Sequence, residues 1–375
     1  MVGYQFMGKM HSHAYRDFPF YFDTDVKPVL QAISGRNEES VKAAADKMGW
    51  ATYETDWRRL IERDDIDVID IVTPNHMHAE IAIAAAEAGK HIIIEKPLAM
   101  TVKQAESMLE AVQKHHVIHM ICHNYRFAPA VQYAKKLIDE GRLGKLYHIR
   151  ANYLQDFIVD PSFPLVWRLQ KDVSGSGSLG DIGAHSIDLA RFLVGEFKEI
   201  VAMMETFIKE RPLAALQGGL SATADIEKLG TVTVDDAVAF LARFDNGVFG
   251  TFEATRFAQG NRNKNKFEIN GEKGSIRWDM ENMNNLEVYL ANDEQGLQGF
   301  RLINCTEASH PFAGAYWPAG HIIGYEHTFI NLVHDFMQAI GNGTQPRPDF
   351  EDGVKNQRVL EAIEESALTK RWISL

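Results

Sequence analysis

The chain has 375 residues, 45% of them hydrophobic, so it can bury a sizeable core and is long enough for two domains. Its formal net charge of -12 argues against a nucleic-acid partner, because phosphate binding needs clustered Lys and Arg side chains. No apolar run approaches the roughly 18 residues that cross a bilayer, and the N-terminus lacks a secretory pattern, so we expect no membrane partner and a cytoplasmic location. Cys122 and Cys305 lie far apart and predict neither a disulfide framework nor a zinc site.

The first third of the chain alternates short apolar runs with helical stretches, which is typical of a parallel sheet built from strand–helix units. Asn37 and Thr101 are placed to cap two of the helices, and Gly89 is placed to end another. Residues 1–123 therefore predict a dinucleotide-binding domain of the Rossmann type within an α/β protein. The predicted strands are 26–34, 67–72, 91–95 and 117–122, and the predicted helices are 38–48, 76–88 and 102–114.

From residue 124 onward, longer alternating runs predict strands at 146–155, 232–244 and 247–254, with helices near 180–194 and 325–341. Residues 124–375 therefore predict an α+β domain that binds substrate on a large, mostly antiparallel open sheet. Such a sheet would leave Val, Phe and Leu side chains exposed on one face, so we expect this domain to form a homodimer or homotetramer.

The segment from Gly3 to Gly8 stands where a G-x-G-x-x-G turn lets backbone N–H groups approach a pyrophosphate. Gln5 replaces the middle glycine. Because only two residues precede Gly3, we expect the first strand to be missing, its central place in the sheet to be empty and cofactor affinity to suffer. No carboxylate follows the next strand, and Arg36 there suits either the 2′-phosphate of NADP or stacking on the adenine of NAD.

Two groups are candidates for acid–base chemistry. Lys96 ends a strand at the sheet edge where such folds bind ligands, and its ammonium could stabilise an alkoxide as hydride leaves carbon. Asp181, His185 and Asp188 are spaced to share one helical face, and a carboxylate one turn from an imidazole can orient it for proton transfer. A metal held by Asp181 and His185, or a helix-capping role for Asp181, would also fit, although no fourth metal ligand is evident. We expect no metal.

Several other histidines occur in pairs that resemble metal ligands by spacing alone. They are His11 with His13, His76 with His78, and His115 with His116. Because each pair lies on a helix start or a turn without a matching set of cysteines or carboxylates, we interpret these residues as caps or surface groups. His78 is the exception, since it follows the strand end at Thr73-Pro74-Asn75 and should lie near the cofactor.

With these motifs in order, the chain resembles the Gfo/Idh/MocA family of sugar and inositol oxidoreductases over essentially its whole length. The family motifs are Gly3 to Lys9, Thr73-Pro74-Asn75 with His78, Glu95-Lys96-Pro97, Asn124 to Phe127, and Gly180 to His185. Gln155-Asp156-Phe157, Pro164 to Leu169, Gly320-His321 and Gly324 to His327 look most like the levoglucosan dehydrogenase branch, whose members oxidise the 3-hydroxyl of a sugar.

The resemblance implies NAD as cofactor, with NADP possible, a sugar substrate, and catalysis by Lys96, Asp181 and His185. It implies that the cofactor is lined by Gly3, Phe6, Met7, Gly8, Arg36, Thr73, Asn75, His78, Glu95, Lys96 and Asn124. It implies that the sugar is lined by Tyr125, Tyr153, Gln155, Trp167, Arg168, Asp181, His185 and His327. Two alternatives stay open: a glycosidase or epimerase that oxidises its substrate transiently with bound NAD, and a non-catalytic nucleotide-sensing regulator. The complete set of proton-transfer groups argues against the regulator.

Overall fold

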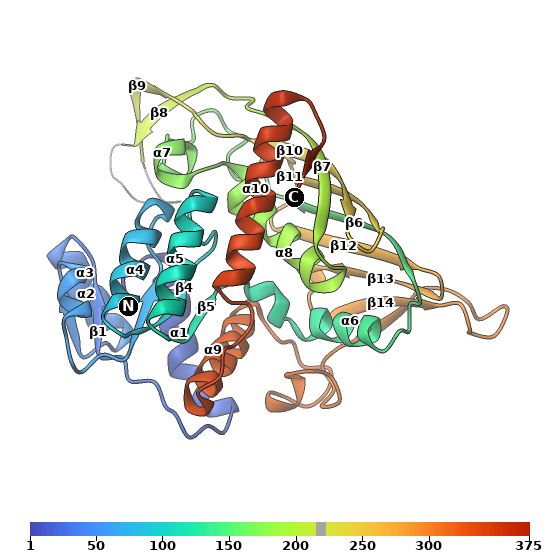
Figure 1. The fold of residues 1–375 in the computed structure, drawn as a ribbon, viewed down its shortest axis with the longest axis horizontal. Coiled ribbons are helices and arrows are strands. Elements are labelled where there is room, and N and C mark those ends of the chain that lie inside the picture. Colours follow the sequence, from blue (N-terminus) through green and yellow to red (C-terminus); the bar gives the residue numbers. More distant parts are fainter. Residues whose placement is uncertain (215–222) are drawn as a thin grey trace. The chain divides into compact units, whose positions relative to one another are not determined.

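The computed structural model describes residues 1–214 and 223–375, which divide into two compact units (Figure 1). Unit 1 comprises Met1–Phe127 and Ile323–Gln357, and unit 2 comprises Ala128–Ile322 and Arg358–Leu375. Over the residues described, no helix is both long and apolar enough to cross a membrane. The predicted fold class is confirmed, because unit 1 holds a parallel sheet and unit 2 a large, mostly antiparallel one.

Unit 1 contains five short parallel strands that are connected through helices. In the sheet, β1 pairs with β2, and β3 pairs with β4, which pairs in turn with β5. The strand predicted at 26–34 is present only over its last three residues, which match the three-residue length of its partner β2. The strands are β1 (Ala32–Ser34), β2 (Thr52–Glu54), β3 (Val68–Ile71), β4 (His91–Ile94) and β5 (His119–Ile121).

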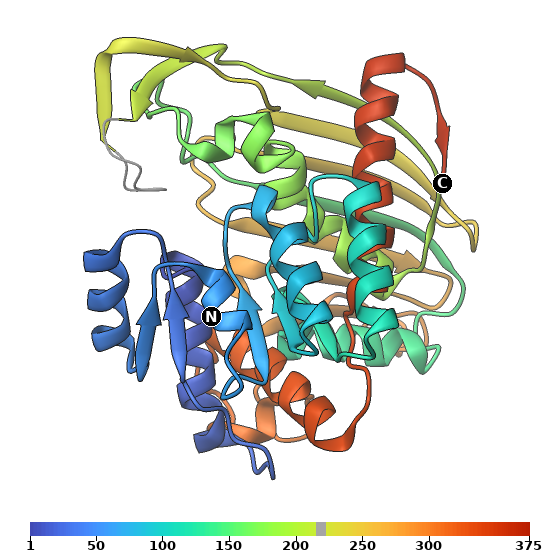
Figure 2. The same ribbon diagram turned by 60° about the vertical axis from the view of Figure 1, so that its left-hand side comes forward.

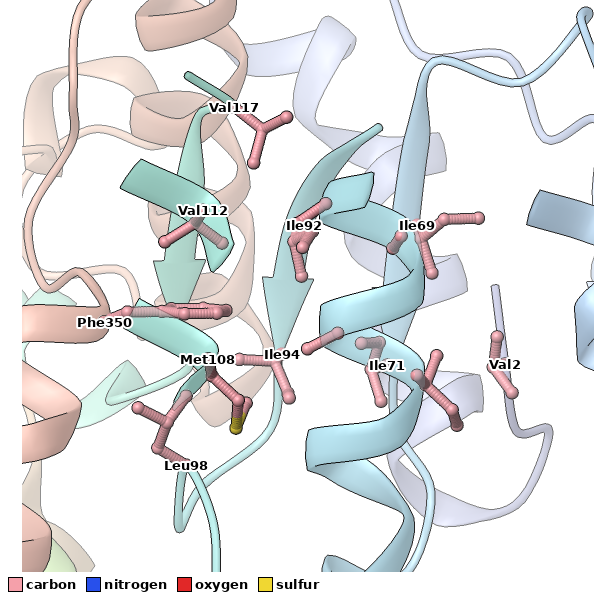
Figure 3. Packing of buried hydrophobic residues seen from close by; sticks show 14 of the residues in the cluster. Val2, Ile69, Ile71, Ile92, Ile94, Leu98, Met108, Val112, Val117 and Phe350 are labelled. Atoms are coloured by element: carbon pink, nitrogen blue, oxygen red, sulfur yellow. The ribbon is translucent and has the colours of Figure 1, made fainter. Parts of the chain in front are cut away.

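The central place in this sheet is not empty, and the expectation that it would be is wrong. Val2 forms parallel bridges with Ser34 of β1 on one side and with Ile71 of β3 on the other. Its amide donates to the Asp70 carbonyl at 2.7 Å, and its carbonyl accepts from the Val72 amide at 3.0 Å. Figure 3 shows the Val2 side chain beside Ile71. Met1 and Val2 therefore join the two halves of the sheet and hold the turn that follows.

The helices of unit 1 cover this sheet and close its core. The predicted helices at 38–48 and 102–114 are confirmed, with Asn37 and Thr101 accepting hydrogen bonds as N-caps. α4 and α5 lie side by side in both views (Figures 1 and 2) and pack with Phe350 over the isoleucines of β3 and β4 (Figure 3). The elements are α1 (Phe6–Tyr21), α2 (Glu38–Met48), α3 (Trp57–Ile61), η1 (Asn75–Met77), α4 (His78–Glu87), α5 (Val102–Lys114), η2 (Asn124–Phe127), α9 (Tyr325–Asn342) and the start of α10 (Phe350–Thr369).

Unit 2 is built on a nine-stranded sheet with the order β15-β14-β13-β12-β6-β11-β10-β7-β16, in which only β6 and β11 run parallel. The predicted strand at 232–244 begins later, because residues 232–236 form a connection whose aspartates bind backbone amides elsewhere. The strands are β6 (Leu146–Leu154), β7 (Phe197–Glu205), β8 (Glu210–Ala214), β9 (Ala224–Thr231), β10 (Ala237–Phe244), β11 (Phe249–Thr255), β12 (Lys264–Gly271), β13 (Gly274–Asp279), β14 (Asn285–Leu290), β15 (Arg301–Asn304) and β16 (Ile373–Ser374).

The buried helix α8 packs against β6 and β12 of this sheet, and a single π-helical turn, η4, precedes it. A regular helix was predicted across 180–194, so the π turn is a departure from the sequence pattern. Isolated π turns are uncommon and often mark functional sites. The helical elements are α6 (Pro129–Asp139), η3 (Trp167–Leu169), α7 (Lys171–Ser174), η4 (Leu179–Gly183), α8 (Ala184–Leu193), η6 (Met280–Asn282), η7 (Ala313–Ala315) and the remainder of α10.

Candidate active site

The turn between Val2 and α1 has the backbone geometry of a phosphate-binding loop. Gly3 has φ +110°, and a Cβ there would lie 2.8 Å from the Val72 carbonyl oxygen, so a side chain is excluded. A Cβ on Gly8 would lie 2.7 Å from the Gly3 carbonyl oxygen. Gln5 is the N-cap of α1, where its exposed side chain leaves the helix N-terminus open. The cradle therefore fits a dinucleotide pyrophosphate despite the missing middle glycine.

The remaining predicted cofactor residues lie at the ends of the same parallel strands. Phe6 is 56% exposed and Met7 is half-buried at the start of α1, and Arg36 is exposed just after β1. Thr73 and Asn75 are half-buried in the segment that follows β3. All of them belong to unit 1, at the edge where open parallel sheets bind ligands.

His78 is completely buried and lies between two backbone carbonyls. Its Nδ1 lies 3.0 Å from the Pro97 oxygen and its Nε2 lies 3.0 Å from the Thr73 oxygen. Burial lowers the pKa of His78, so the ring is neutral near pH 7 and carries one N–H, which can donate to only one of these carbonyls at a time. His78 thus connects the segment after β3 to the segment after β4.

Lys96 lies two residues after the end of β4, and its side chain is half-buried. The neighbouring Glu95 is buried, and its Oε2 accepts a hydrogen bond from the Lys96 amide at 3.1 Å. The backbone at the lysine is therefore held by the side chain of the residue before it.

A second group of predicted residues gathers at the start of α9, also within unit 1. The Asn124 amide donates to the Thr328 hydroxyl at 2.9 Å, and the Tyr125 ring lies 6.1 Å from the Tyr325 ring. Nδ1 of His327 accepts from the Gly324 amide at 3.0 Å. Burial lowers the pKa of His327, which keeps this ring neutral near pH 7.

In unit 2, the Asp181 carboxylate lies between two guanidinium groups. Arg168 Nε is 3.9 Å from Asp181 Oδ1, and Arg256 Nη1 is 3.5 Å from Asp181 Oδ2. Arg256 is completely buried and also donates to the Asp235 carbonyl at 3.2 Å, whereas the Asp181 side chain is 24% exposed. Arg168 stacks on Trp167 with its guanidinium carbon 4.3 Å from the ring centre. Asp181 does not cap a helix and is held as the anion of this cluster.

Polar residues at and just after the end of β6 lie beside α8 in the same unit. The Tyr153 hydroxyl and the Gln155 amide both donate to Asn263 Oδ1, at 2.7 and 2.8 Å. The His185 ring is 8% exposed, and its centre lies 5.9 Å from that of Tyr153. Unit 2 therefore carries hydroxyl, amide, carboxylate, imidazole and guanidinium groups, which can bind a polar small molecule.

The side chain of Asp235 holds the segment that leads into the π turn carrying Asp181. Its carboxylate accepts from the amides of Gly177 and Leu179 at 2.7 and 2.8 Å and from the Ser178 hydroxyl at 2.5 Å. A Cβ on Gly177 would lie 1.9 Å from the Asp235 carbonyl oxygen, so only glycine allows this approach. Asp181 lies in the π turn, whereas His185 and Asp188 both lie in the regular helix α8, so the spacing from Asp181 to His185 is not that of one continuous α-helix.

One interpretation from the sequence is wrong. His11 is neither a cap nor a surface group, since it is 1% exposed with both ring nitrogens on carboxylates. Sequence reasoning also missed Arg256, Asn263 and Asp235, which sit in irregular segments far along the chain from the groups they contact. For His11 the sequence does contain a local signal of burial, because it lies three residues, about one helical turn, after Gly8 on the same face of α1.

Comparison with known proteins agrees with this arrangement. A model of the oxidoreductase family with an NAD-binding Rossmann fold matches residues 1–123, and a model of the GFO/IDH/MocA C-terminal domain matches residues 131–277. The chain is 45% identical to levoglucosan dehydrogenase from Pseudarthrobacter phenanthrenivorans over 100% of its own length and 97% of that protein. It is 28% identical to myo-inositol 2-dehydrogenase from Thermotoga maritima over 92% of this chain and 91% of that protein.

Two solved structures match the whole chain closely. A levoglucosan dehydrogenase in complex with NADH and levoglucosan shares 45% identity with a TM-score of 0.95, and an oxidoreductase domain protein from Kribbella flavida shares 48% identity with a TM-score of 0.94. In both comparisons the alignment covers 100% of this chain and 97% of the other.

Proposed function

The chain belongs to the Gfo/Idh/MocA family of oxidoreductases, and we propose that it oxidises the 3-hydroxyl of a pyranose such as levoglucosan or a glucoside. Its reaction class is that of an NAD-dependent sugar dehydrogenase. The observation that carries the finer proposal is the 45% identity to levoglucosan dehydrogenase over the full chain, together with the polar cluster around Asp181. We assign nucleotide binding to residues 1–123 and substrate binding to residues 124–375.

NAD, when bound, supplies the hydride acceptor at nicotinamide C4. The glycine cradle and the residues after β1 and β3 would hold it: Gly3, Phe6, Met7, Gly8, Arg36, Thr73 and Asn75. His78, Glu95 and Asn124 are buried and bonded within unit 1, so we assign them to positioning these segments rather than to direct contact.

Oxidation of a ring alcohol removes a hydroxyl proton whose pKa is far above neutrality, so the reaction needs a proton acceptor and a positive charge near the oxygen. In our proposal the Lys96 ammonium donates to that oxygen, and His185 accepts the proton. Asp181 orients the sugar and the imidazole and remains an anion, because two guanidiniums favour its charged form.

The other sugar-binding groups are assigned by chemistry. Hydroxyl, amide and guanidinium groups distinguish individual sugar hydroxyls, and a flat indole covers the apolar face of a pyranose. These groups are Tyr125, Tyr153, Gln155, Trp167, Arg168 and His327.

The direct test is a panel of levoglucosan, glucose, glucosides and inositols assayed for net reduction of NAD. We expect the highest kcat/KM on a pyranose and a 3-keto product identified by NMR. Turnover of sugar without net NADH would instead indicate transient oxidation with retained cofactor. An inositol preferred over every pyranose, or a keto group at another carbon, would overturn the substrate proposal.

We also propose that the exposed face of the nine-stranded sheet forms a homodimer or homotetramer. Met203 of β7 is 70% exposed and Leu241 of β10 is 41% exposed, and both line a shallow apolar groove across neighbouring strands. Light scattering should show an oligomer for the wild type and a monomer for Met203→Glu/Leu241→Glu. A wild-type monomer at micromolar concentration would contradict the proposal. NAD-dependent sugar metabolism also fits a cytoplasmic location.

A further inference from the structure

A buried charged cluster lies beneath the ligand-binding edge of the unit 1 sheet. His11 of α1 meets Asp70 of β3, Glu95 after β4 and Cys122 after β5. His11 Nδ1 lies 3.0 and 2.9 Å from the two Asp70 oxygens, and Nε2 lies 3.0 Å from Glu95 Oε1. These residues are all at most 6% exposed. One imidazole therefore connects the first helix to the ends of successive strands.

The geometry determines the protonation state of His11. Carboxylates are negatively charged as well as hydrogen-bond acceptors, so a carboxylate on each ring nitrogen favours an imidazole that donates from both and carries a positive charge. Burial opposes that charge, but the field of Asp70 and its hydrogen bond outweigh burial and raise the pKa of His11 well above 6.5. The ring is therefore an imidazolium at neutral pH.

Apart from Asp70 and Glu95, four titratable groups around His11 are neutral near pH 7. Burial raises the pKa of the Cys122 thiol to about 12, and it raises that of the Tyr15 and Tyr325 phenols well above 10. Burial also lowers the pKa of the Met1 amine to about 5. The positive charge that faces Asp70 and Glu95 therefore comes from His11.

The link to the reaction runs through the second oxygen of Glu95. Oε1 meets His11, and Oε2 accepts the Lys96 amide at 3.1 Å. We propose that His11 is a positioning residue: its imidazolium fixes the Glu95 carboxylate, which fixes the backbone from which Lys96 reaches the substrate. The inference rests on the proposed role of Lys96, and His11 itself touches no reacting atom.

A metal ion is an alternative occupant of this cluster, because His11, Glu95 and Cys122 each offer a ligand atom within 4.8 Å of the others. A metal would have to displace the proton on Nε2 and deprotonate a thiol whose pKa is about 12. The existing contacts satisfy every ring nitrogen without a metal, which favours the imidazolium.

The first measurement detects the charge directly, without using activity. In 15N-histidine-labelled protein, we expect two strongly downfield ring N–H signals from one residue that persist at pH 8.5 and vanish in His11→Gln. A single ring N–H at pH 8.5, or stoichiometric zinc retained after purification, would overturn the proposal.

The second measurement asks whether His11 acts through Lys96. We expect His11→Gln to lower kcat by about tenfold to 10²-fold, since small displacements of a reacting group cost this much. In a Lys96→Ala background the same change should have no further effect on kcat, because the coupled residues are non-additive. Phe18→Leu, a buried apolar change on the same helix, is the control for lost stability and should leave kcat within about twofold.

The outcomes separate the two proposals. An equal loss of kcat from His11→Gln with and without Lys96 means that His11 acts elsewhere, and the positioning proposal fails. Full turnover by Lys96→Ala refutes the proposed role of the lysine, whatever His11 does. If His11→Gln does not fold, Glu95→Gln tests the same link, since it removes the carboxylate charge and keeps an oxygen for the Lys96 amide.

Discussion

Arg256 offers a sharp test of how unit 2 holds the Asp181 carboxylate. Its guanidinium is completely buried, and its Nη1 lies 3.5 Å from Asp181 Oδ2. At 3.5 Å and an effective dielectric of about 20, two unit charges attract by about 5 kcal/mol. Asp181 is 24% exposed and keeps Arg168 at 3.9 Å, so solvent and the second cation offset most of this. We expect Arg256→Met to lose about 1–3 kcal/mol of transition-state stabilisation, or about 10- to 10²-fold in kcat/KM.

The pH profile distinguishes an electrostatic role from a structural one. Without Arg256 the negative form of Asp181 is less favoured, so the acidic limb of the kcat/KM profile should move to higher pH. Arg256→Lys keeps the charge and should restore the limb, although its geometry is poorer. Arg191→Met is the matched control, because Arg191 is a buried guanidinium on α8 that pairs with Glu196 instead. It should reduce stability and leave the limb in place.

The reasoning would be refuted by an Arg256→Met enzyme that folds, keeps kcat/KM within about twofold and shows an unmoved acidic limb. In that case Arg168 alone would suffice to keep Asp181 charged. A shift of the same size in Arg191→Met would refute it as well, since that change does not touch Asp181.

Three further predictions follow from other residues. Lys96→Ala and His185→Ala should each lower kcat about 10²- to 10⁴-fold in stopped-flow NADH assays, while the affinity for NAD changes less. Full turnover by either variant would show that the substituted residue has no part in the mechanism. Arg36→Ala should reduce kcat/KM with NADP about tenfold and leave kcat/KM with NAD nearly unchanged. Equal losses with both cofactors would mean that Arg36 does not bind the 2′-phosphate. Burial and then Arg347 lower the pKa of His119 from 6.5 to about 4, so its contribution to stability is present above pH 6.5 and is lost as the pH falls toward 4. Urea unfolding should show a loss of about 3 kcal/mol over this range, and His119→Gln should abolish this pH dependence.

Features that depend on neighbouring residues could be predicted from the sequence. Helices α2 and α5 begin and end as expected, because Asn37 and Thr101 cap them from within one turn. The strand–helix alternation likewise predicts the parallel sheet. The short β1 is the exception in this unit, since its length is limited by the partner it pairs with.

Features that depend on distant residues could not be predicted in this way. The segment that leads into the π turn η4 is held by Asp235, which lies 58 positions beyond Gly177. The charge of His11 requires Asp70 and Glu95, 59 and 84 positions away. Arg256 is 75 positions from Asp181 and lies in a segment with no motif of its own. Local periodicity carries no information about which buried charge meets which.

Sequence motifs therefore identify Lys96 and Asp181 more readily than the buried residues that hold them. Both occur in short motifs: Lys96 lies two residues after β4, and Asp181 lies in the turn that precedes α8. His11 and Arg256 are buried cations that face Glu95, the residue before Lys96, and Asp181 itself. Removing a buried cation weakens the compensation of its carboxylate, so changes at these two positions should affect kcat as strongly as changes at many of the residues proposed to bind the sugar. The effect of a substitution on this enzyme should therefore follow the buried charge contacts of the site rather than distance from the substrate alone.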